Sequence, residues 1–423
     1  MKISKYNLVI QKEGRKYVYN QLRSSLLEVD EELSQLLSMS NENIVLLDKE
    51  LRDDLLANGM ICEDGLNEEN VILASSKKQR FGNDTARVTI LPTLNCNFHC
   101  WYCYEKHLDS KMKADDITKV ISFCRDIICN GSVKNFHLDW FGGEPLMYFD
   151  EIVFPISVAV KEICHSCNVI FRNSITTNGY FINLEMIRRM NEIDLKSFQI
   201  TLDGGKQFHN KTRFSAKEKN SYDVIVRNIV RLCYAIPDIR MLVRINYTPK
   251  NIDSIEDIAE SFPDDVRPKI EIIPQLVWQF KENVNLMESS LKKKMETFIK
   301  KGYRRSFARL GCVLCYAENM TQYVINYNLL VYKCTARDFS EKYAIGLLDE
   351  NGKFLPKPYY YDYFIASSFE NTKCLSCHLL PSCLGTCVQR HMENIESKCD
   401  KEDIENSIRN KILLYIEQTE KLD

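Results

Sequence analysis

Cysteine usage constrains this chain more than any other feature of its sequence. The 423 residues include 17 cysteines, of which three stand together at positions 96, 100 and 103 and eight lie between residues 312 and 399. The first residues contain no apolar export segment, which predicts a cytoplasmic protein. Because disulfides are rare in that reducing compartment, the grouped cysteines indicate bound metal or catalysis rather than covalent crosslinks.

The remaining composition excludes several classes of protein. Hydrophobic residues make up 45% of the chain and charged residues 27%, which is typical of a folded globular protein rather than a disordered one. The formal net charge is −2, so no basic excess indicates a nucleic-acid partner. No run of about 18 apolar residues occurs, so we expect no membrane partner either.

The cysteine triplet follows a strand-like run at residues 87–91. Cys96, Cys100 and Cys103 have the spacing CxxxCxxC, and three thiolates can bind three irons of a [4Fe–4S] cluster. The fourth iron would then stay open to a substrate or cofactor. The alternative is a structural zinc site, which would need a fourth ligand such as His99 or His107.

Three further motifs follow the triplet, each after a strand-like run. They are Trp140-Phe-Gly-Gly-Glu144-Pro145, Ser174-Ile-Thr-Thr-Asn-Gly179 and Phe198-Gln-Ile-Thr201-Leu-Asp203-Gly204. In this order, with the triplet, they resemble the motifs of the radical S-adenosylmethionine (SAM) superfamily. The resemblance implies that the triplet holds the cluster that cleaves SAM. It also implies that SAM is bound by Tyr102, Gly142, Gly143, Glu144, Thr201, Arg213, Asn246 and Leu276.

The resemblance further implies a role for each of these side chains. Glu144 would pair with the ammonium of SAM, and Thr201 and Arg213 would reach its carboxylate and ribose. Asn246 and Leu276 would lie near the ribose and adenine, and the aromatic ring before the third cysteine would flank the adenine. No residue is assigned as a catalytic general base.

Strand-like and helix-like runs alternate between about residues 85 and 280, which predicts an α/β fold. Amphipathic segments between the strands are expected to be helices, for example Asp115–Cys129, Asn183–Ile193 and Tyr222–Tyr234. Six such units predict a parallel, partly open barrel, or partial (β/α)6 barrel, with its chemistry at the carboxyl ends of the strands. The expected strands are Val88–Leu91, Asn135–Trp140, Val169–Thr176, Ser197–Leu202, Arg240–Asn246 and Lys269–Ile273.

The carboxyl-terminal cysteines resemble the SPASM iron–sulfur domain, which binds two auxiliary [4Fe–4S] clusters. A family glycine normally stands where this chain has Leu329, so the preceding hairpin is expected to turn differently, at Asn326 or Asn328. Four ligands per cluster would leave no iron open for substrate; the alternative is two zinc ribbons. The resemblance implies one cluster on Cys312, Cys315, Cys334 and Cys387, and another on Cys374, Cys377, Cys383 and Cys399.

The amino-terminal region resembles winged-helix-like domains that capture a leader peptide. Tyr6–Gln11 and Lys16–Leu22 predict paired strands, and Met60–Cys62 a third. Leu26–Met39 and Ile44–Ala57 predict helices. Such a domain would add the leader as a strand to its sheet, although a simple cap on the barrel is the alternative. The many acidic residues here argue against DNA binding.

We therefore expect a winged-helix-like domain at residues 1–75, a linker at 76–84, a radical SAM barrel at 85–300 and a SPASM domain at 301–423. The pair Cys164 and Cys167 forms an isolated CxxC, which is weak grounds for a metal site. Six cysteines outside the two groups are expected to be buried core thiols, namely Cys62, Cys124, Cys129, Cys164, Cys167 and Cys233.

The leading hypothesis is a radical SAM enzyme that modifies a ribosomally synthesised precursor peptide. A 5′-deoxyadenosyl radical would abstract hydrogen from a substrate residue, and an auxiliary cluster would accept an electron as a thioether or another crosslink forms. The cofactors would be SAM and three [4Fe–4S] clusters. The partners would be a precursor peptide with its leader and an electron donor such as flavodoxin or ferredoxin.

Two alternatives belong to different functional classes. An anaerobic sulfatase maturase would share this domain order, but it places an aspartate directly after the cysteine that matches Cys334. Here that neighbour is Thr335, and Asp338 stands three residues further on. A non-catalytic zinc-binding interaction protein is the more remote alternative, and it predicts zinc and no affinity for SAM.

Overall fold

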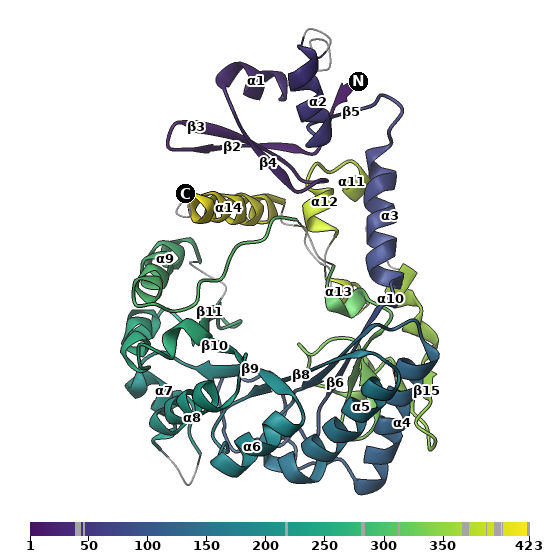
Figure 1. Ribbon diagram of the computed structural model, residues 1–423, viewed down its shortest axis with the longest axis vertical. Helices are drawn as coiled ribbons and strands as arrows, with labels where there is room; N and C mark the ends of the chain where they lie inside the picture. Colours follow the sequence, from purple (N-terminus) through teal and green to yellow (C-terminus); the bar gives the residue numbers. More distant parts are fainter. Residues whose placement is uncertain are drawn as a thin grey trace. The chain divides into compact units, whose positions relative to one another are not determined.

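The computed structural model describes residues 1–38, 44, 47–215, 219–280, 284–311, 314–365, 372–385, 387–392, 399 and 401–420. Its contacts divide the chain into two compact units, which Figure 1 shows coloured along the sequence. We call Asn83–Ser306 with Thr321–Tyr360 the sheet unit. We call Met1–Gly82 with Phe307–Met320 and Tyr361–Asp423 the terminal unit.

A ten-stranded sheet forms the sheet unit, in the order β11-β10-β9-β8-β7-β6-β12-β13-β14-β15. The first six strands of that order pair in parallel, and β12 (Gln322–Ile325) joins β6 in parallel as well. The last three pair antiparallel: β13 (Leu330–Tyr332), β14 (Gly346–Leu348) and β15 (Phe354–Pro356). The six parallel strands are β6 (Thr85–Ile90), β7 (Asn135–Trp140), β8 (Ile170–Thr177), β9 (Leu195–Leu202), β10 (Arg240–Tyr247) and β11 (Ile270–Leu276).

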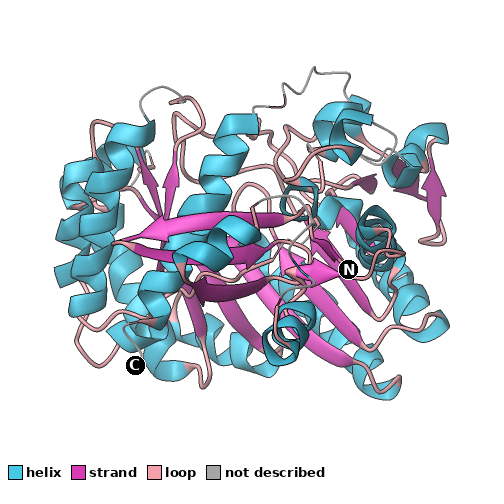
Figure 2. Ribbon diagram, turned by 90° about the horizontal axis from the view of Figure 1, so that it is seen from above, coloured by secondary structure: helices cyan, strands magenta, loops and turns pink. Residues whose placement is uncertain are grey.

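Helices cover one face of the parallel strands, as Figures 1 and 2 show. Alternate strand residues such as Phe136, Leu138 and Trp140 are buried beneath the helices, whereas their neighbours are only partly buried on the opposite face, here called the open face. The predicted α/β fold with a parallel-rich sheet is therefore confirmed. The helices of this unit are α4 (Ala114–Asn130), α5 (Phe154–Ser166), α6 (Leu184–Glu192), α7 (Lys206–Thr212), α8 (Ser221–Ala235) and α9 (Val284–Lys300).

The terminal unit contains an antiparallel sheet covered on both faces. Its strands are β2 (Asn7–Lys12), β3 (Arg15–Asn20) and β4 (Ser25–Val29). Leu8 and Ile10 pack against Ile412 and Ile416 of α14 (Lys401–Thr419). Val18 on the other face packs toward α1 (Glu31–Leu36), α2 (Lys49–Ala57) and β5 (Ile61–Cys62), which pairs with β1 (Lys2–Ile3). Short helices complete the unit: α10 (Asp362–Ile365), α11 (Thr372–Leu375), α12 (Leu380–Cys383) and α13 (Val388–Met392).

The amino-terminal hairpin is confirmed, but the helix predicted at Leu26–Met39 is wrong at its start. Residues 25–29 form β4, because they pair with β3, and helix α1 begins only after Asp30, whose carboxylate accepts a hydrogen bond from Leu33 N–H at 2.8 Å. Residue 39 lies outside the described residues. The second helix begins at Lys49 rather than Ile44, because Asp48 caps it in the same way.

The segment predicted as a linker is largely helical. Helix α3 (Glu68–Phe81) runs through most of residues 76–84. Its Arg80 is buried and forms an ion pair with Glu318 at 2.5 Å, which ties the helix to the Phe307–Met320 segment of the same unit. Among the described helices, none is both long and apolar enough to cross a membrane.

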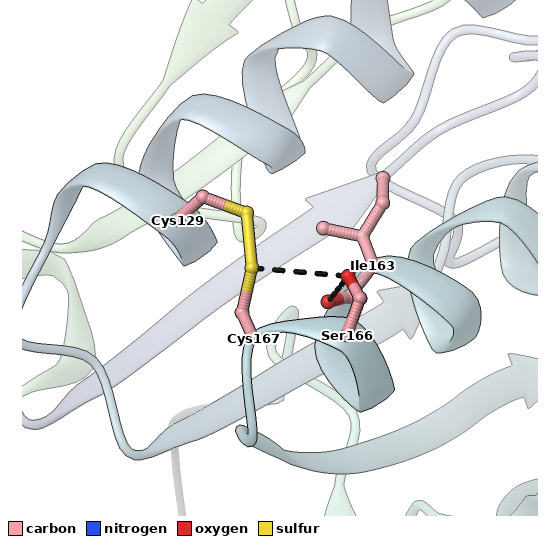
Figure 3. The surroundings of a disulfide bond; sticks show 4 residues. All are labelled: Cys129, Ile163, Ser166 and Cys167. Carbon is pink, nitrogen blue, oxygen red and sulfur yellow. Dashed lines mark hydrogen bonds between the residues drawn. A yellow bond between two sulfur atoms is a disulfide. The ribbon is translucent and has the colours of Figure 1, made fainter.

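Four of the six scattered cysteines are buried as expected, namely Cys62, Cys124, Cys164 and Cys233. The other two correct the prediction. Cys129 at the end of α4 is exposed, Cys167 directly after α5 is partly exposed, and the two form a disulfide (Figure 3). They are therefore neither core thiols nor half of a CxxC metal site. Sequence separation hid this pairing, because the α4 and α5 helices meet only in the folded sheet unit.

Candidate functional site

The first cysteine group lies in the loop that follows β6. Phe98 anchors this loop, because its ring is fully buried and its N–H donates to Cys96 Sγ at 3.4 Å. Cys103 N–H donates to the Cys100 carbonyl at 3.0 Å, which closes a tight turn between the last two cysteines. The loop therefore has a defined conformation at the carboxyl end of a parallel strand, where such folds place their chemistry.

Cys96 and Cys100 are partly buried, whereas Cys103 is exposed. Burial raises the pKa of Cys96 to about 12, and the nearby Glu144 carboxylate adds to the effect. Burial likewise raises the pKa of Cys103 to about 11 and that of Cys100. Thiols of this kind release their protons only when a cation replaces them, as metal ligands do.

Ligation by these cysteines stays a prediction. Among the described residues, no three His, Cys, Asp or Glu side chains are arranged to hold a single metal ion. A four-iron cluster makes a different demand, because each thiolate binds its own iron and the sulfurs stand farther apart than around one ion. The donor set of three soft sulfurs fits such a cluster better than it fits a hard cation.

Two glycines bring a second loop against the cysteine loop. Gly142 and Gly143 have φ values of +80° and +45°, which side-chain-bearing residues rarely adopt. A Cβ on Gly143 would lie 2.1 Å from the carbonyl oxygen of Asn95, so only glycine allows this approach. Gly143 N–H donates to Glu105 at 2.7 Å, and burial raises the pKa of Glu105 to about 7. Backbone groups of the two loops thus form a narrow cradle.

Glu144 is fully buried directly after the two glycines. Its carboxylate accepts hydrogen bonds from Thr177 Oγ1 at 2.6 Å, Asn178 N–H at 2.7 Å and Leu146 N–H at 3.0 Å. Burial raises the pKa of Glu144, and these donors oppose the shift. Three donors leave about one acceptor position free of the four that a carboxylate offers. Glu144 therefore has one acceptor position for the predicted contact with the ammonium of SAM, and this contact stays a prediction.

Tyr102 is the centre of a hydrogen-bond network at the strand ends. Its hydroxyl donates to Asp203 at 2.6 Å and accepts from Arg213 at 2.9 Å and from Asn246 at 3.0 Å. These partners follow β9 or lie on β10, so the network joins the cysteine loop to two neighbouring strands. The structure thus brings together three of the predicted SAM-binding residues, Tyr102, Arg213 and Asn246.

Asp203 belongs to this network although the sequence prediction omitted it. Asp203 Oδ1 and Arg213 Nε are buried and find no hydrogen-bond partner among the described residues. An unpaired buried polar atom costs roughly 1–3 kcal/mol, so a polar ligand with donors and acceptors would fit here. The signal was present in the sequence, because Asp203 is the acid of the quoted Leu-Asp-Gly motif. His209 Nδ1 accepts a hydrogen bond from the backbone N–H of Asp203 at 3.3 Å, which helps to fix the position of Asp203.

Thr201 and Leu276 lie at strand ends but outside the printed network of Tyr102. Thr201 is buried near the end of β9, in register with Arg244 of β10, which donates to Asn246 at 2.9 Å. Leu276 is the last residue of β11 and pairs in register with Tyr247. Both positions are compatible with the predicted SAM contacts, which no observed contact tests.

Four carboxyl-terminal cysteines lie near one another in the terminal unit. Burial raises the pKa of Cys374 and Cys383, and repulsion from the neighbouring Cys377 and Cys399 thiolates adds to it. These four are the predicted ligands of one auxiliary cluster. Their ligation stays a prediction.

The other auxiliary set is only partly described. Cys312 lies outside the described residues, Cys315 and Cys387 belong to the terminal unit, and Cys334 belongs to the sheet unit. The hairpin before Cys334 turns at Asn326, whose carbonyl accepts from Leu329 N–H at 2.9 Å. Leu329 itself has φ +65°, so this leucine adopts the left-handed conformation that the family's glycine would favour.

Comparison with known proteins identifies one domain and a shared fold. Residues 90–262 match the sequence model of the Radical SAM superfamily. Solved structures add the fold: anSMEcpe with bound AdoMet and Cp18Cys peptide has a TM-score of 0.52 at 16% identity, covering 77% of this chain and 99% of that one. Residues 90–262 thus carry a Radical SAM domain, and the chain shares its fold with anSMEcpe.

Curated relatives fall into more than one functional group. GTP 3′,8-cyclase from Clostridium perfringens is 27% identical over 211 residues, 47% of this chain and 58% of that protein. The chain therefore spans about 58% of the cyclase's length. Radical SAM cyclopropyl synthase TigE from Paramaledivibacter caminithermalis is 22% identical over 447 residues, which cover 91% of this chain and 89% of TigE. The cysteine-type anaerobic sulfatase-maturating enzyme from Clostridium novyi is 30% identical over 168 residues, which cover 38% of this chain and 44% of that enzyme.

Proposed function

We propose that this enzyme modifies a ribosomally synthesised precursor peptide. The observation that carries the proposal is the cysteine loop beside the Tyr102 network, at the carboxyl ends of the parallel strands. Cys96, Cys100 and Cys103 would hold a [4Fe–4S] cluster there, and SAM would bind alongside. Together these groups supply one-electron cleavage of SAM to a radical that abstracts hydrogen from the substrate.

The chain's own residues would position SAM and exclude water. The Gly142–Gly143 cradle offers backbone groups at close range, since any Cβ on Gly143 would strike Asn95. Asp203 and Arg213 carry the buried unpartnered atoms that a ribose or carboxylate would satisfy. Glu144 has one acceptor position left for the ammonium. Thr201, Asn246 and Leu276 would complete the pocket.

Peptide modification is supported by a structural neighbour that was solved with a peptide. The fold of anSMEcpe with bound AdoMet and Cp18Cys peptide matches 77% of this chain and 99% of that chain, whereas the similarity to GTP 3′,8-cyclase covers 58% of the cyclase. We propose a thioether or another crosslink as the product. The carboxyl-terminal cysteines would form a SPASM domain with two auxiliary clusters, through one of which the second electron would leave. An electron donor such as flavodoxin or ferredoxin would be a partner of the enzyme.

Leader recognition would fall to the first 75 residues. Both faces of the β2-β3-β4 sheet are covered by helices, so only strand edges can receive a peptide. At the β2 edge, Arg409 already donates to the Val9 carbonyl at 2.7 Å. The outer edge of β4 is the better candidate, because no backbone hydrogen bond of the described residues engages it. An open edge of this kind suits strand addition.

Anaerobic reconstitution tests the proposal. The loaded enzyme should contain about twelve irons if three clusters form, and it should cleave SAM to 5′-deoxyadenosine. Cys96→Ala should abolish that cleavage. Cys164→Ala is the matched control, because Cys164 is a fully buried core thiol outside the site and its loss should leave cleavage intact. A loaded wild-type enzyme that never yields 5′-deoxyadenosine would refute the proposal.

Sulfatase maturation is the second candidate. It is favoured by the 30% identity to the Clostridium novyi sulfatase-maturating enzyme. Asp338 is the available acid near Cys334, but it accepts from Ser340 and pairs with Lys106 at 3.4 Å, and these contacts hold its pKa below the usual range despite burial. A carboxylate tied in this way is a poor general base. Formation of a hydrazine-reactive aldehyde on a sulfatase-motif peptide would favour this candidate.

A further inference from the structure

The open face of the parallel strands is polar where closed barrels are apolar. In a closed (β/α)8 barrel, branched apolar side chains fill the interior. Here Arg87, His137 and Arg172 stand side by side on β6, β7 and β8, paired in register across the sheet. Their neighbours along the strands include the buried residues Ala86, Val88, Phe136, Leu138 and Asn173. Because successive side chains of a strand alternate between faces, the three side chains of the row project from the opposite face. A polar row of this kind calls for a polar occupant or solvent.

Two members of the row contact each other, and a neighbouring carboxylate holds one of them. Arg87 donates to Asp139 Oδ2 at 2.5 Å, and Ser174 donates to the other oxygen of Asp139. A second nitrogen of Arg87 lies 3.2 Å from His137 Nδ1. A guanidinium can only donate, so Nδ1 accepts and the ring proton of neutral His137 lies on Nε2. Burial and the Arg87 charge lower the pKa of His137 to about 4, which keeps the ring neutral at pH 7.

Arg172 supplies a positive charge that has no partner among the described residues. Its side chain is exposed, and no hydrogen bond or ion pair with it is found there, although it lies close enough to lower the pKa of His137. Arg87 is also accessible, with 41% of its side chain exposed, whereas Asp139 is 15% exposed and already holds two donors. Arg87 is thus partly satisfied by Asp139, whereas the described residues supply no acceptor for Arg172 or for the Nε2–H of His137.

We propose that the row of Arg87, His137 and Arg172 binds a carboxylate of the substrate and thereby selects peptides that carry an acidic side chain. A carboxylate presents acceptor oxygens to several donors at once, and arginine binds it with two parallel hydrogen bonds. The inference rests on the proposed function for the identity of the substrate as a peptide. The binding site itself depends only on the geometry of β6, β7 and β8.

A pair of probes that differ in charge alone tests the site. The loaded enzyme is titrated at pH 7 with N-acetyl-glutamate methylamide or N-acetyl-glutamine methylamide, while the His137 ring Cε1–H resonance is followed by NMR. His137→Gln identifies that resonance by its disappearance. We expect the glutamate probe to shift it with an affinity about tenfold or more above that of the glutamine probe, as one charge-assisted contact provides.

Matched variants locate the effect. Arg172→Gln should remove the preference for the charged probe, and Arg172→Lys should restore part of it. Arg125→Gln is the control, because Arg125 is an exposed arginine of α4 on the helix-covered side of the same unit, and it should change nothing. Equal affinity for both probes, or a charge preference that survives Arg172→Gln, would overturn the proposal.

A separate readout distinguishes this inference from the proposed function. SAM cleavage without peptide should be the same in Arg172→Gln and in wild type, because Arg172 belongs to neither the cysteine loop nor the Tyr102 network. Wild-type enzyme that binds the charged probe but never cleaves SAM would refute the proposed function and leave the anion site standing. Cleavage of SAM without any charge preference would refute the site alone.

Discussion

The two groups of cysteines have different structural supports. The first group stands on a loop that the fold positions by itself: Phe98 anchors it in the core, Gly143 admits a neighbouring backbone, and the Tyr102 hydroxyl ties it to two strands. None of these contacts requires a metal. The parallel strands form the frame that positions this loop.

The second group stands on short helical turns. Helices α11 and α12 are four residues each, far below the length at which a helix is stable alone. A small core of Tyr6, Ile72, Leu380 and Leu384 supports them, and Gln21 donates to the His378 carbonyl at 2.8 Å. The contrast teaches that the fold makes the first site, whereas bound metal should help make the fold around the second.

Removing one ligand from each group should cost a similar amount of iron but should affect stability differently. Cys383→Ala should destabilise the terminal unit by about 3 kcal/mol or more, because ligand binding and folding are coupled in that segment. It should also remove about four of about twelve irons. Cys96→Ala should remove a similar amount of iron and leave the unfolding temperature almost unchanged. Calorimetry and iron analysis of both variants decide the matter, and equal unfolding temperatures would break the comparison.

Adding one methyl group should destabilise the tightly packed Gly142–Gly143 cradle more than an open turn of the terminal unit. Gly143→Ala should cost about 2–4 kcal/mol and abolish SAM cleavage, because the new Cβ meets the Asn95 carbonyl in addition to the strain of a positive φ. Gly14→Ala is the matched control in the terminal unit. Gly14 has φ +81° and nothing within 4 Å of its Cβ position, so only strain of about 1–2 kcal/mol applies. Similar losses in both variants would show that the cradle is not tight.

The buried ion pair of α3 in the terminal unit should contribute more to stability than an exposed ion pair of the sheet unit. Arg80→Met leaves Glu318 buried and unpaired, which should cost about 3–5 kcal/mol. The exposed Arg188→Met, which breaks pairs with Glu185 and Glu192 on α6, should cost less than about 1 kcal/mol. Chemical denaturation of both variants at pH 7 compares the two.

The pH dependence of the Arg80→Met variant follows from the sign of one shift. Burial raises the pKa of Glu318 in the folded protein, and Arg80 opposes that shift. Without Arg80 the folded pKa should rise further, so the folded state binds the proton more readily than the unfolded one. Stability is then lost as pH rises above the ordinary glutamate pKa of about 4.3 and recovers as pH falls toward it. A deficit that is constant with pH would contradict a buried, unpaired carboxylate.

Local patterns predicted the parallel strands, because alternation of buried and accessible residues repeats along each strand. The expected runs and the observed β6 to β11 agree to within a few residues at each end. The motif residues Tyr102, Arg213 and Asn246 also meet as expected, since the carboxyl ends of neighbouring parallel strands lie together. The parallel strands and the meeting of these motif residues could therefore be predicted from local sequence patterns.

Features that depend on distant partners were beyond reach of the sequence. Residues 25–29 carry the apolar spacing of a helix, yet pairing with β3 makes them a strand. Residues 76–81 resemble a polar linker, yet Arg80 finds Glu318 238 positions away and the segment is helical. Cys129 and Cys167 likewise pair because α4 and α5 pack together. In each case a tertiary contact outweighed the local propensity.

Leu329 offers the smallest and sharpest test, because here a strained backbone and a buried side chain oppose each other. The residue is 8% exposed and holds φ +65° at the turn that leads to Cys334. Burial of a leucine contributes about 1.5–3 kcal/mol, and a left-handed conformation costs about 1–2 kcal/mol. Leucine therefore persists where glycine would be unstrained, since packing slightly outweighs strain.

Two truncations separate these opposing contributions. Leu329→Ala loses the packing and keeps the strain, so it should be destabilised by about 2 kcal/mol. Leu329→Gly loses the packing and the strain together, so it should be nearly as stable as wild type, within about 1 kcal/mol. Glycine should thus exceed alanine in stability at this position, the reverse of the usual order inside a strand or helix. Thermal unfolding of the two variants measures the difference, and an alanine variant at least as stable as the glycine variant would mean that Leu329 does not adopt the left-handed conformation in solution.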